Sequence, residues 1–570
     1  MNTKNTKEKM IIYQVFTRLF GNQTTERVTS GTIEENGCGK MNYFTKKALD
    51  EIKKLGATHI WYTGIIAHAT QTDYSKYGML KDHPAVVKGK AGSPYAIKDY
   101  YDVDPDLAVD VDNRMKEFED LVKRTHKSKM KMIIDFVPNH VARQYHSIAK
   151  PEGVKDLGED DLTDQAFNPN NNFYYIPGKK LEGQINLFDD EAGSYVEMPA
   201  KATGNNRFDA WPEVNDWYET VKLNYGVDYI YNSGCHFDPV PDTWKKMCDI
   251  LLFWASKGID GFRCDMAEMV PCEFWGWAIP RVKKEYKDII FIAEVYNPNE
   301  YRNYIFNGHF DYLYDKVGLY DTLRAVTCGN ASAADITNCW QSINDIQDHM
   351  LNFLENHDEQ RIASEFFIGD AERAFPAMIV SACMNTNPMM IYFGQELGEP
   401  GMEHEGFSGR DGRTTIFDYW CVDSIRRWEN EGRFTQSKLT KKEKEIRKFY
   451  KTLLNLCNEE KALQQGEFFD LMYVNHGNWQ LNESKQYAFL RQYKNEVLLI
   501  IANFGDFPMK VSLNLPEHAF NYLEMPCYDE CEAEDLLTGK KERISFTFKE
   551  PTTLDLPASF GKILKIKLKK

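Results

Sequence analysis

The sequence alternates short runs of β-forming residues with amphipathic helical stretches from its start to about Gln395, and this alternation limits the available folds more than any other feature. Several of the runs are apolar almost throughout, as expected of parallel strands that are covered on both faces. Helical spacing of apolar residues is clearest in residues 44–56, 114–124 and 241–258. The eight strand candidates are residues 11–16, 59–64, 130–137, 261–266, 289–295, 311–315, 350–356 and 388–396.

Eight parallel strands with helical crossovers predict an α/β fold, a (β/α)8 TIM barrel, although an open doubly wound sheet would give a similar string of elements. Two regions depart from the alternation. Residues 140–231 are rich in Asn, Asp, Gly, Pro and aromatic residues and are too long for a connection, so they predict an inserted subdomain after the third strand. After about Leu463 the sequence turns to alternating runs, which predict an antiparallel β-sandwich. We therefore expect the barrel in residues 1–139 and 232–462, the inserted subdomain B in 140–231 and the C-terminal sandwich in 463–570.

Charge and composition exclude several classes of partner. The chain has 570 residues and a formal net charge of −16, which disfavours nucleic acids and anionic membrane surfaces. No apolar run approaches the roughly 18 residues of a membrane-spanning helix. The N-terminus lacks the pattern of a signal peptide, so we expect a cytoplasmic protein, or a secreted or periplasmic one if the sequence was trimmed. The twelve cysteines lie mostly in apolar segments, which indicates free thiols in a reducing compartment. We expect a monomer.

Charged residues stand at the ends of the fourth and fifth predicted strands, where a barrel of this type carries its chemistry. Period two places Arg263 and Asp265 on one face of the fourth strand. The guanidinium would favour the ionised form of Asp265, which is the form that a nucleophile needs. The fifth strand ends in Glu294 between two apolar neighbours, and such surroundings favour the protonated form that suits a proton donor.

The third and seventh predicted strands also end in polar clusters. Singly, each cluster has a structural alternative, such as an ion pair, a solvent-facing acid or a turn cap. Together they favour catalysis, because buried charges cost free energy unless pairing or function retains them. Glu355 is assigned to the strand itself. The residues are Asp135, Asn139 and His140 on the third strand, and Glu355, Asn356, His357 and Asp358 on the seventh.

A nucleophilic carboxylate beside a separate proton-donating carboxyl group is the arrangement of retaining glycoside hydrolysis. Asp265 would attack the anomeric carbon, and Glu294 would protonate the leaving oxygen and later activate water. The two carboxyl groups are expected about 5 to 5.5 Å apart.

Four short motifs resemble those of the α-amylase family of glycoside hydrolases, in the order and on the strands where that family carries them. They read DFVPNH, GFRCDMAEMVP, AEVY and FLENHD. The stretches IIYQVF, PYAIKDYYDVDP and GQELG are also similar to the family, so the resemblance covers nearly the whole chain. It implies an enzyme that acts on α-1,4-linked glucans or malto-oligosaccharides through a covalent glycosyl-aspartate intermediate.

The resemblance also implies roles for individual residues. Asp265 would be the nucleophile, Glu294 the general acid/base, and Asp358 the third carboxylate, which binds sugar hydroxyls. The residues expected to orient the nucleophile or to bind the sugar in subsite −1 are Arg263, His140, His357 and Tyr95. Trp211 and Trp217 are candidates for the cleft wall, with core packing as the alternative for each.

The resemblance also implies a candidate calcium site. Asn139 is a candidate calcium ligand, and the chemistry itself requires no cofactor. A lysine-histidine pair that helps to build the outer subsites and the calcium site in many α-amylases is replaced here by Glu268 and Met269. Residues 102–113 mimic the start of a calcium loop but lack its glycine and final glutamate, so we expect a solvated loop there.

Other functions stay open at this point. A transglycosylase, an α-glucosidase or a sucrose-type enzyme of the same family would share the covalent mechanism. A catalytically silent glucan-binding protein is disfavoured because all three carboxylates are present. Unrelated barrel chemistry is disfavoured because the sequence has no Walker-type loop and no HExxH.

Overall fold

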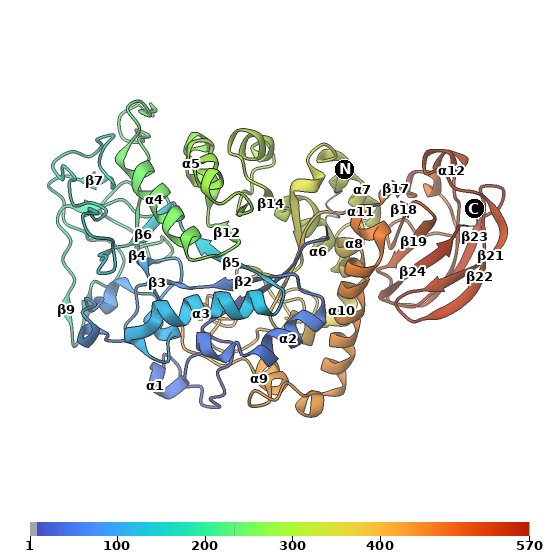
Figure 1. Ribbon diagram of the computed structural model, residues 1–570, viewed down its shortest axis with the longest axis horizontal. Helices are drawn as coiled ribbons and strands as arrows, with labels where there is room; N and C mark the ends of the chain where they lie inside the picture. Colours follow the sequence, from blue (N-terminus) through green and yellow to red (C-terminus); the bar gives the residue numbers. More distant parts are fainter. Residues whose placement is uncertain (1–7, 233, 569–570) are drawn as a thin grey trace.

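The computed structural model describes residues 8–232 and 234–568, and within them eight parallel strands close into a barrel (Figure 1). Each predicted strand has its counterpart in the barrel, and closure excludes the open sheet. In barrel order the strands are β1 (Ile11–Phe16), β2 (His59–Thr63), β5 (Lys131–Phe136), β12 (Gly261–Cys264), β13 (Ile290–Ala293), β14 (Tyr312–Tyr314), β15 (Met350–Phe353) and β16 (Met389–Tyr392), which pairs with β1.

Local sequence signals mark the start and the end of the first long helix. In α2 (Lys46–Leu55), the Thr45 side chain accepts the N–H of Ala48, and Gly56 ends the helix in the left-handed region. The helix buries its apolar face against the barrel. The other main helices are α3 (Arg114–Lys127), α4 (Asp242–Ser256), α5 (Cys272–Glu285), α6 (Asp321–Thr327), α7 (Ile336–Ser342), α8 (Phe375–Cys383), α9 (Asp423–Glu429) and α10 (Lys441–Glu459).

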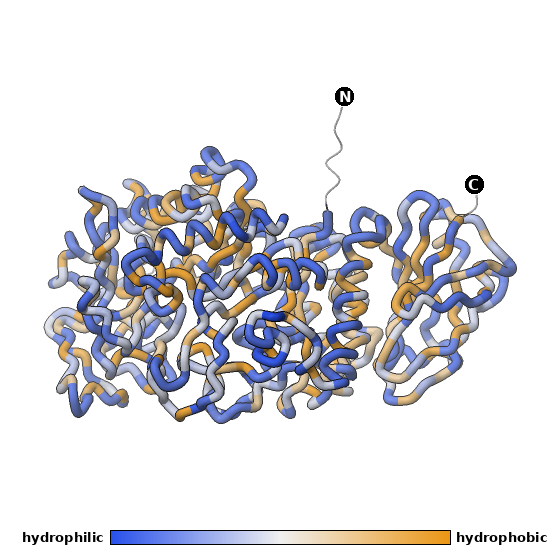
Figure 2. Tube along the Cα trace, turned by 60° about the horizontal axis from the view of Figure 1, so that its bottom comes forward, coloured by the Kyte–Doolittle hydropathy of each residue, from blue (hydrophilic) through white to orange (hydrophobic). Residues whose placement is uncertain are grey.

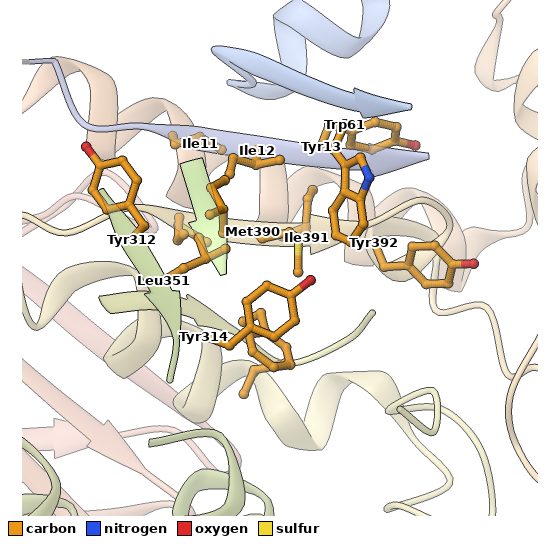
Figure 3. Packing of buried hydrophobic residues seen from close by; sticks show 14 of the residues in the cluster. Ile11, Ile12, Tyr13, Trp61, Tyr312, Tyr314, Leu351, Met390, Ile391 and Tyr392 are labelled. Atoms are coloured by element: carbon orange, nitrogen blue, oxygen red, sulfur yellow. The ribbon is translucent and has the colours of Figure 1, made fainter. Parts of the chain in front are cut away.

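The barrel interior is filled by side chains. Every residue of β1, β2, β12, β15 and β16 is buried. Figure 3 shows Ile12 of β1, Met390 of β16 and Leu351 of β15 in one cluster. Such a core leaves the ends of the strands as the place where polar side chains can meet.

The segment between β5 and β12 forms an inserted subdomain of short antiparallel pairs, as the sequence predicts. It lies at the end of the molecule opposite the C-terminal sheets (Figure 1). The pairs are β6 (His140–Ala142) with β11 (Thr220–Lys222), β7 (Tyr175–Ile176) with β10 (Ala200–Lys201), and β8 (Phe188–Asp189) with β9 (Gly193–Ser194).

The C-terminal part is an antiparallel β-sandwich, and Figure 2 shows hydrophilic and hydrophobic residues interspersed along its chain. The strands β17, β21 and β23 were not expected from the sequence. One sheet runs in the order β17 (Glu467–Asp470), β18 (Gln486–Tyr493), β19 (Glu496–Asn503), β24 (Phe560–Lys567), β21 (Tyr528–Asp535) and β22 (Lys540–Phe546), and β20 (Met509–Leu513) pairs with β23 (Thr552–Leu556). We keep the numerical domain limits at 139/140, 231/232 and 462/463 as proposals.

One expectation about a loop is wrong. The first half of residues 102–113 is buried rather than solvated, since Asp104 and Asp106 have no exposed surface. Asp106 accepts hydrogen bonds from the hydroxyls of Tyr74 at 2.6 Å and Tyr419 at 2.7 Å, which compensates the burial of its carboxylate.

The sequence predicts no membrane-spanning helix, free thiols and no signal peptide. None of the helices in residues 8–232 and 234–568 has the length and apolarity needed to cross a membrane. The twelve cysteines, which all lie among the described residues, are free thiols. Residues 1–7, which contribute to the expectation that there is no signal peptide, lie outside the described residues.

Candidate active site

A cleft of about 740 Å³ opens at the carboxyl ends of the barrel strands. The three predicted catalytic carboxylates line it together. Residues 214–215 and 217–220 of the inserted subdomain and two stretches after β16, 405–409 and 416–418, form further wall. Of the predicted site residues, Asp265, Glu294, Asp358, His140 and Tyr95 belong to this lining.

Arg263 is the central residue beneath the cleft and is fully buried. Its Nη1 donates a hydrogen bond of 2.7 Å to Asp265 Oδ1, and its Nη2 lies at ion-pair distance, 2.8 Å, from Glu294 Oε2. The rings of Trp61, Tyr95 and Tyr314 surround the guanidinium, with centroids 5.2 to 5.5 Å from its central carbon. One arginine thus holds both predicted catalytic carboxylates.

The protonation of Asp265 is set by opposing influences. Burial raises the pKa of the Asp265 carboxyl well above its usual range, the Arg263 guanidinium lowers it, and the neighbouring Glu294 raises it further. The sequence alone indicates only the arginine. The structure adds burial, which is the larger influence and moves the pKa in the opposite direction.

Both oxygens of Glu294 have partners. Oε2 accepts the backbone N–H of Met266 at 2.8 Å, and Oε1 accepts the hydroxyl of Tyr296 at 2.5 Å. Met266 reaches this position because its φ is 43°, in the left-handed region, whereas the sequence analysis placed it in the strand. A non-glycine residue in that region costs about 1–2 kcal/mol, and such strain is often found at functional sites.

Asp358 and His357 form a second polar group at the end of β15. Burial on its own raises the pKa of Asp358, but His357 together with Arg263 and Arg413 outweighs it, so that the pKa is lowered and the carboxylate stays ionised. His357 Nε2 lies 3.1 Å from Asp358 Oδ2 and 2.5 Å from the Tyr95 hydroxyl, and Gln14 Nε2 lies 2.9 Å from Nδ1. The side chain of Asp358 is 31% exposed, so it can contact a ligand.

His140 and Trp217 line the cleft, whereas Trp211 does not. Burial and two nearby lysines lower the pKa of His140 to about 3, so its imidazole is neutral in the working range. Its ring lies 5.3 Å from that of Trp217, which lines the cleft. Trp211 is 56% exposed and lies outside the lining, so it is neither cleft wall nor core.

The surroundings of Asn139 do not fit a calcium ion. Strand pairing places Lys222 of β11 directly opposite His140, and its ammonium donates to Asn139 Oδ1 and lies 3.4 Å from the carbonyl oxygen of Met269. The lysine is buried, and burial lowers its pKa to about 7. In the part of the chain that the structure describes, no three His, Cys, Asp or Glu side chains gather in a way that could hold a metal.

Two other carboxylates at the strand ends bind neighbouring protein groups and do not line the cleft. Glu355 forms a buried ion pair of 2.9 Å with Arg361 and accepts the N–H of Ile362. Asp135 accepts the Trp61 indole N–H at 3.0 Å and lies 3.5 Å from Arg263 Nη1. Asp135 therefore supports the arginine from below rather than lining the cleft.

Sequence reasoning missed several residues of the site. Tyr296 stands two residues after Glu294, and period two along the strand could have indicated it. Lys222, Gln14 and Trp61 have no local signal, because they reach the site only through strand pairing across the barrel and the insertion.

Comparison with known proteins places this site in a family. Residues 14–466, well over half of the chain, match the family described as "Alpha amylase, catalytic domain". The chain belongs to the α-amylase family. Members of this family are glycoside hydrolases, and this α-amylase-family chain is one as well.

Individual relatives are distant in sequence. The chain is 22% identical to alpha-amylase 3 of Dictyoglomus thermophilum over 532 residues, 90% of this chain and 86% of the relative. It is 27% identical to the alpha-glucosidase of Apis mellifera over 278 residues, 47% of this chain and 36% of the relative. Among solved structures, a noncanonic maltogenic alpha-amylase from Thermotoga neapolitana is similar in fold over both whole chains, with a TM-score of 0.63 at 19% identity.

Proposed function

We propose that this α-amylase-family chain hydrolyses α-1,4-linked glucans or malto-oligosaccharides with retention of configuration, through a covalent glycosyl intermediate on Asp265. The observation that carries the proposal is the arrangement of Asp265 and Glu294 on the two terminal nitrogens of one buried arginine, in a cleft that Asp358 also lines.

In the first step Asp265 attacks the anomeric carbon while the glycosidic bond breaks. Its Oδ1 is bound to Arg263, and its other oxygen has no protein hydrogen bond among the described residues, which supports a role in the attack. Glu294 transfers its proton to the departing glycosidic oxygen, so that the leaving sugar departs as a neutral alcohol.

In the second step water replaces the leaving sugar. Glu294, now ionised, takes a proton from the water as its oxygen attacks the anomeric carbon, and the bond to Asp265 breaks. Both residues return to their starting protonation states. A sugar hydroxyl in place of water would give transglycosylation by the same step.

Binding of the reacting sugar is assigned to Asp358, His357, His140 and Tyr95. Asp358 is ionised and accessible, which suits acceptance of hydrogen bonds from sugar hydroxyls. Arg263 orients the nucleophile. The Tyr95 ring lies on the cleft wall, where it can cover an apolar sugar face.

The cleft extends beyond the carboxylates, which favours a chain of sugars over a single unit. A second hollow of about 520 Å³ shares Ser30, Gly89, Val214 and Tyr218 with the first. This continuity supports an oligo- or polysaccharide substrate and weighs against a sucrose-type enzyme.

We also propose that the protein needs no calcium at Asn139, because the Lys222 ammonium already binds that oxygen. The free cysteines support a reducing compartment such as the cytoplasm. A monomeric state remains part of the proposal.

A product profile tests the substrate. Purified protein is incubated with amylose, pullulan, maltoheptaose, maltose and sucrose, and the products are separated and weighed by mass spectrometry. Shorter maltodextrins from maltoheptaose are expected. Products longer than maltoheptaose would contradict simple hydrolysis and identify a transglycosylase, and cleavage restricted to maltose or sucrose would indicate the glucosidase or sucrose-type alternative.

The variant Asp265→Asn tests the nucleophile. We expect it to fold with an unchanged melting temperature or a higher one, and to lose at least 10³-fold in kcat on maltoheptaose. Activity equal to that of the unaltered protein would refute the assignment, and inactivity of both would favour the glucan-binding alternative.

A further inference from the structure

We propose that Tyr296 is a positioning residue that controls the hydrogen bonding of Glu294 Oε1, and that Glu268 holds Tyr296 in place. This inference rests on the proposed function, in which Glu294 is the general acid/base. It also gives a role to Glu268.

Tyr296 is well placed to act on Glu294. Its hydroxyl lies 2.5 Å from Glu294 Oε1, and its ring lines the cleft beside the carboxylates. The other oxygen, Oε2, is already held by Arg263 and by the N–H of Met266. Because the Met266 N–H donates to Oε2 and the Arg263 guanidinium lies at ion-pair distance from it, the transferable proton is better placed on Oε1, which Tyr296 contacts.

A hydroxyl suits a group that changes its protonation state during each turnover. When Glu294 is ionised, the tyrosine donates to Oε1; when Glu294 is protonated, the same hydroxyl can accept or turn away. The bond to the ionised form is the stronger of the two, since hydrogen bonds with a charged partner exceed neutral ones. Tyr296 therefore favours the ionised form, which acts as base in the second step.

Glu268 determines where the tyrosine lies. Its Oε2 accepts the backbone N–H groups of Tyr296 and Asn297, both at 3.0 Å. These two bonds join the turn after β12 to the turn after β13. A lysine at position 268 would offer donors where these N–H groups need an acceptor, so the carboxylate of Glu268 is linked to the position of Tyr296.

The first test is the variant Tyr296→Phe, which keeps the ring and removes only the hydroxyl. Loss of a donor to the ionised carboxylate should move the alkaline limb of the kcat/KM profile for maltoheptaose to higher pH by roughly half to one unit. At neutral pH, kcat for maltoheptaose should fall about tenfold with KM nearly unchanged. Hydrolysis of maltosyl fluoride should fall by a similar factor, because it passes through the same second step, in which Glu294 acts as base.

The matched control is Tyr301→Phe. Tyr301 lies in the same segment, is buried, and its hydroxyl has no hydrogen-bond partner in the described structure. This variant should reproduce the pH profile of the unaltered protein. If Tyr296→Phe is folded and its profile superimposes on that of the control, the inference is wrong; if the unaltered protein cleaves no α-glucan, the proposed function fails instead.

A double-mutant cycle tests the link to Glu268. Glu268→Ala alone should shift the alkaline limb in the same direction as Tyr296→Phe, and the double variant should shift no further than Tyr296→Phe alone. Glu268→Gln, which keeps an acceptor oxygen, should restore most of the original profile. Additive shifts in the double variant would show that Glu268 does not act through Tyr296.

Discussion

A single residue, Arg263, serves two carboxylates with opposite requirements. Asp265 must be ionised to attack, whereas Glu294 must carry a proton in the first step. The guanidinium binds one oxygen of each, and three aromatic rings isolate it from water. The surroundings of the two residues differ: burial raises the pKa of Asp265, whereas Glu294 accepts hydrogen bonds from the Met266 N–H and the Tyr296 hydroxyl.

The raised pKa of Asp265 has a consequence for the acid limb of the pH profile. A nucleophile with a raised pKa loses its charge at higher pH as the solution is acidified, so kcat/KM should begin to fall well above pH 4, the usual range of an aspartate. The profile is measured with maltosyl fluoride, and melting temperatures at each pH verify that the protein stays folded. An acid limb at or below pH 4 would contradict the burial argument.

The Lys222 ammonium predicts indifference to calcium. EDTA or millimolar calcium should leave the melting temperature of the unaltered protein unchanged within a degree, as measured by calorimetry. Lys222→Met removes the donor from two oxygens and should lower the free energy of unfolding by roughly 2 kcal/mol. Added calcium should not restore this stability, because the oxygens of Asn139 and Met269 fall short of the six to eight ligands that calcium takes. A drop of several degrees on adding EDTA to the unaltered protein would refute the prediction.

Among the elements, the strands were predictable and the turns after them were not. Each barrel strand carries a local apolar signal, and the order of motifs placed Asp265, Glu294 and Asp358 at the same end of the barrel. The left-handed turn at Met266 has no such signal, since nothing in an isolated methionine favours positive φ. It depends on the bond from its N–H to Glu294, which is a contact between neighbouring strands.

The contact of Lys222 with Asn139 could not be predicted either, because it depends on residues far apart in the sequence. Its neighbours in sequence predict only a short strand, and its contact with Asn139 depends on the pairing of β6 with β11 across most of the insertion. Long-range pairing of this kind cannot be read from local periodicity. The strands β17, β21 and β23 were missed for another reason: β17 has only four residues, β21 is rich in acidic residues, and β23 has only two apolar residues.

The long helix α10 offers a test of local sequence signals. Thr440 and Glu443 form a reciprocal capping box at its start. Thr440→Ala should lower the free energy of unfolding by about 1 kcal/mol in urea denaturation, while Thr440→Ser, which keeps the hydroxyl, should change it little. Both variants should retain full activity, because neither residue lines the cleft. An equal loss in both variants would show that the methyl group, not the cap, is responsible.

At the scale of the whole molecule, one buried arginine joins the sandwich to the barrel. Arg491 of β18 donates to the carbonyl oxygens of Met384, Ala462 and Gly466 at 2.6 to 3.1 Å. Met384 directly follows α8, whose residues are all buried. The two parts therefore share an interior, and we expect them to unfold together.

The variant Arg491→Met tests this connection. It removes the hydrogen bonds that Arg491 donates to three carbonyl oxygens and should lower the free energy of unfolding by roughly 2–4 kcal/mol, as measured in guanidinium. Arg491→Lys should recover only part of the loss, because an ammonium lacks the forked geometry of the guanidinium. Separate transitions for sandwich and barrel in the unaltered protein would contradict a shared interior.

The position of the sandwich has a practical consequence. It lies at the opposite end of the molecule from the inserted subdomain that walls the cleft (Figure 1). A linker attached to an exposed side chain of the sandwich, such as Lys549, would fix the protein to a bead with the cleft facing the liquid. Long dissolved polymers could then reach an immobilised catalyst without obstruction by the support.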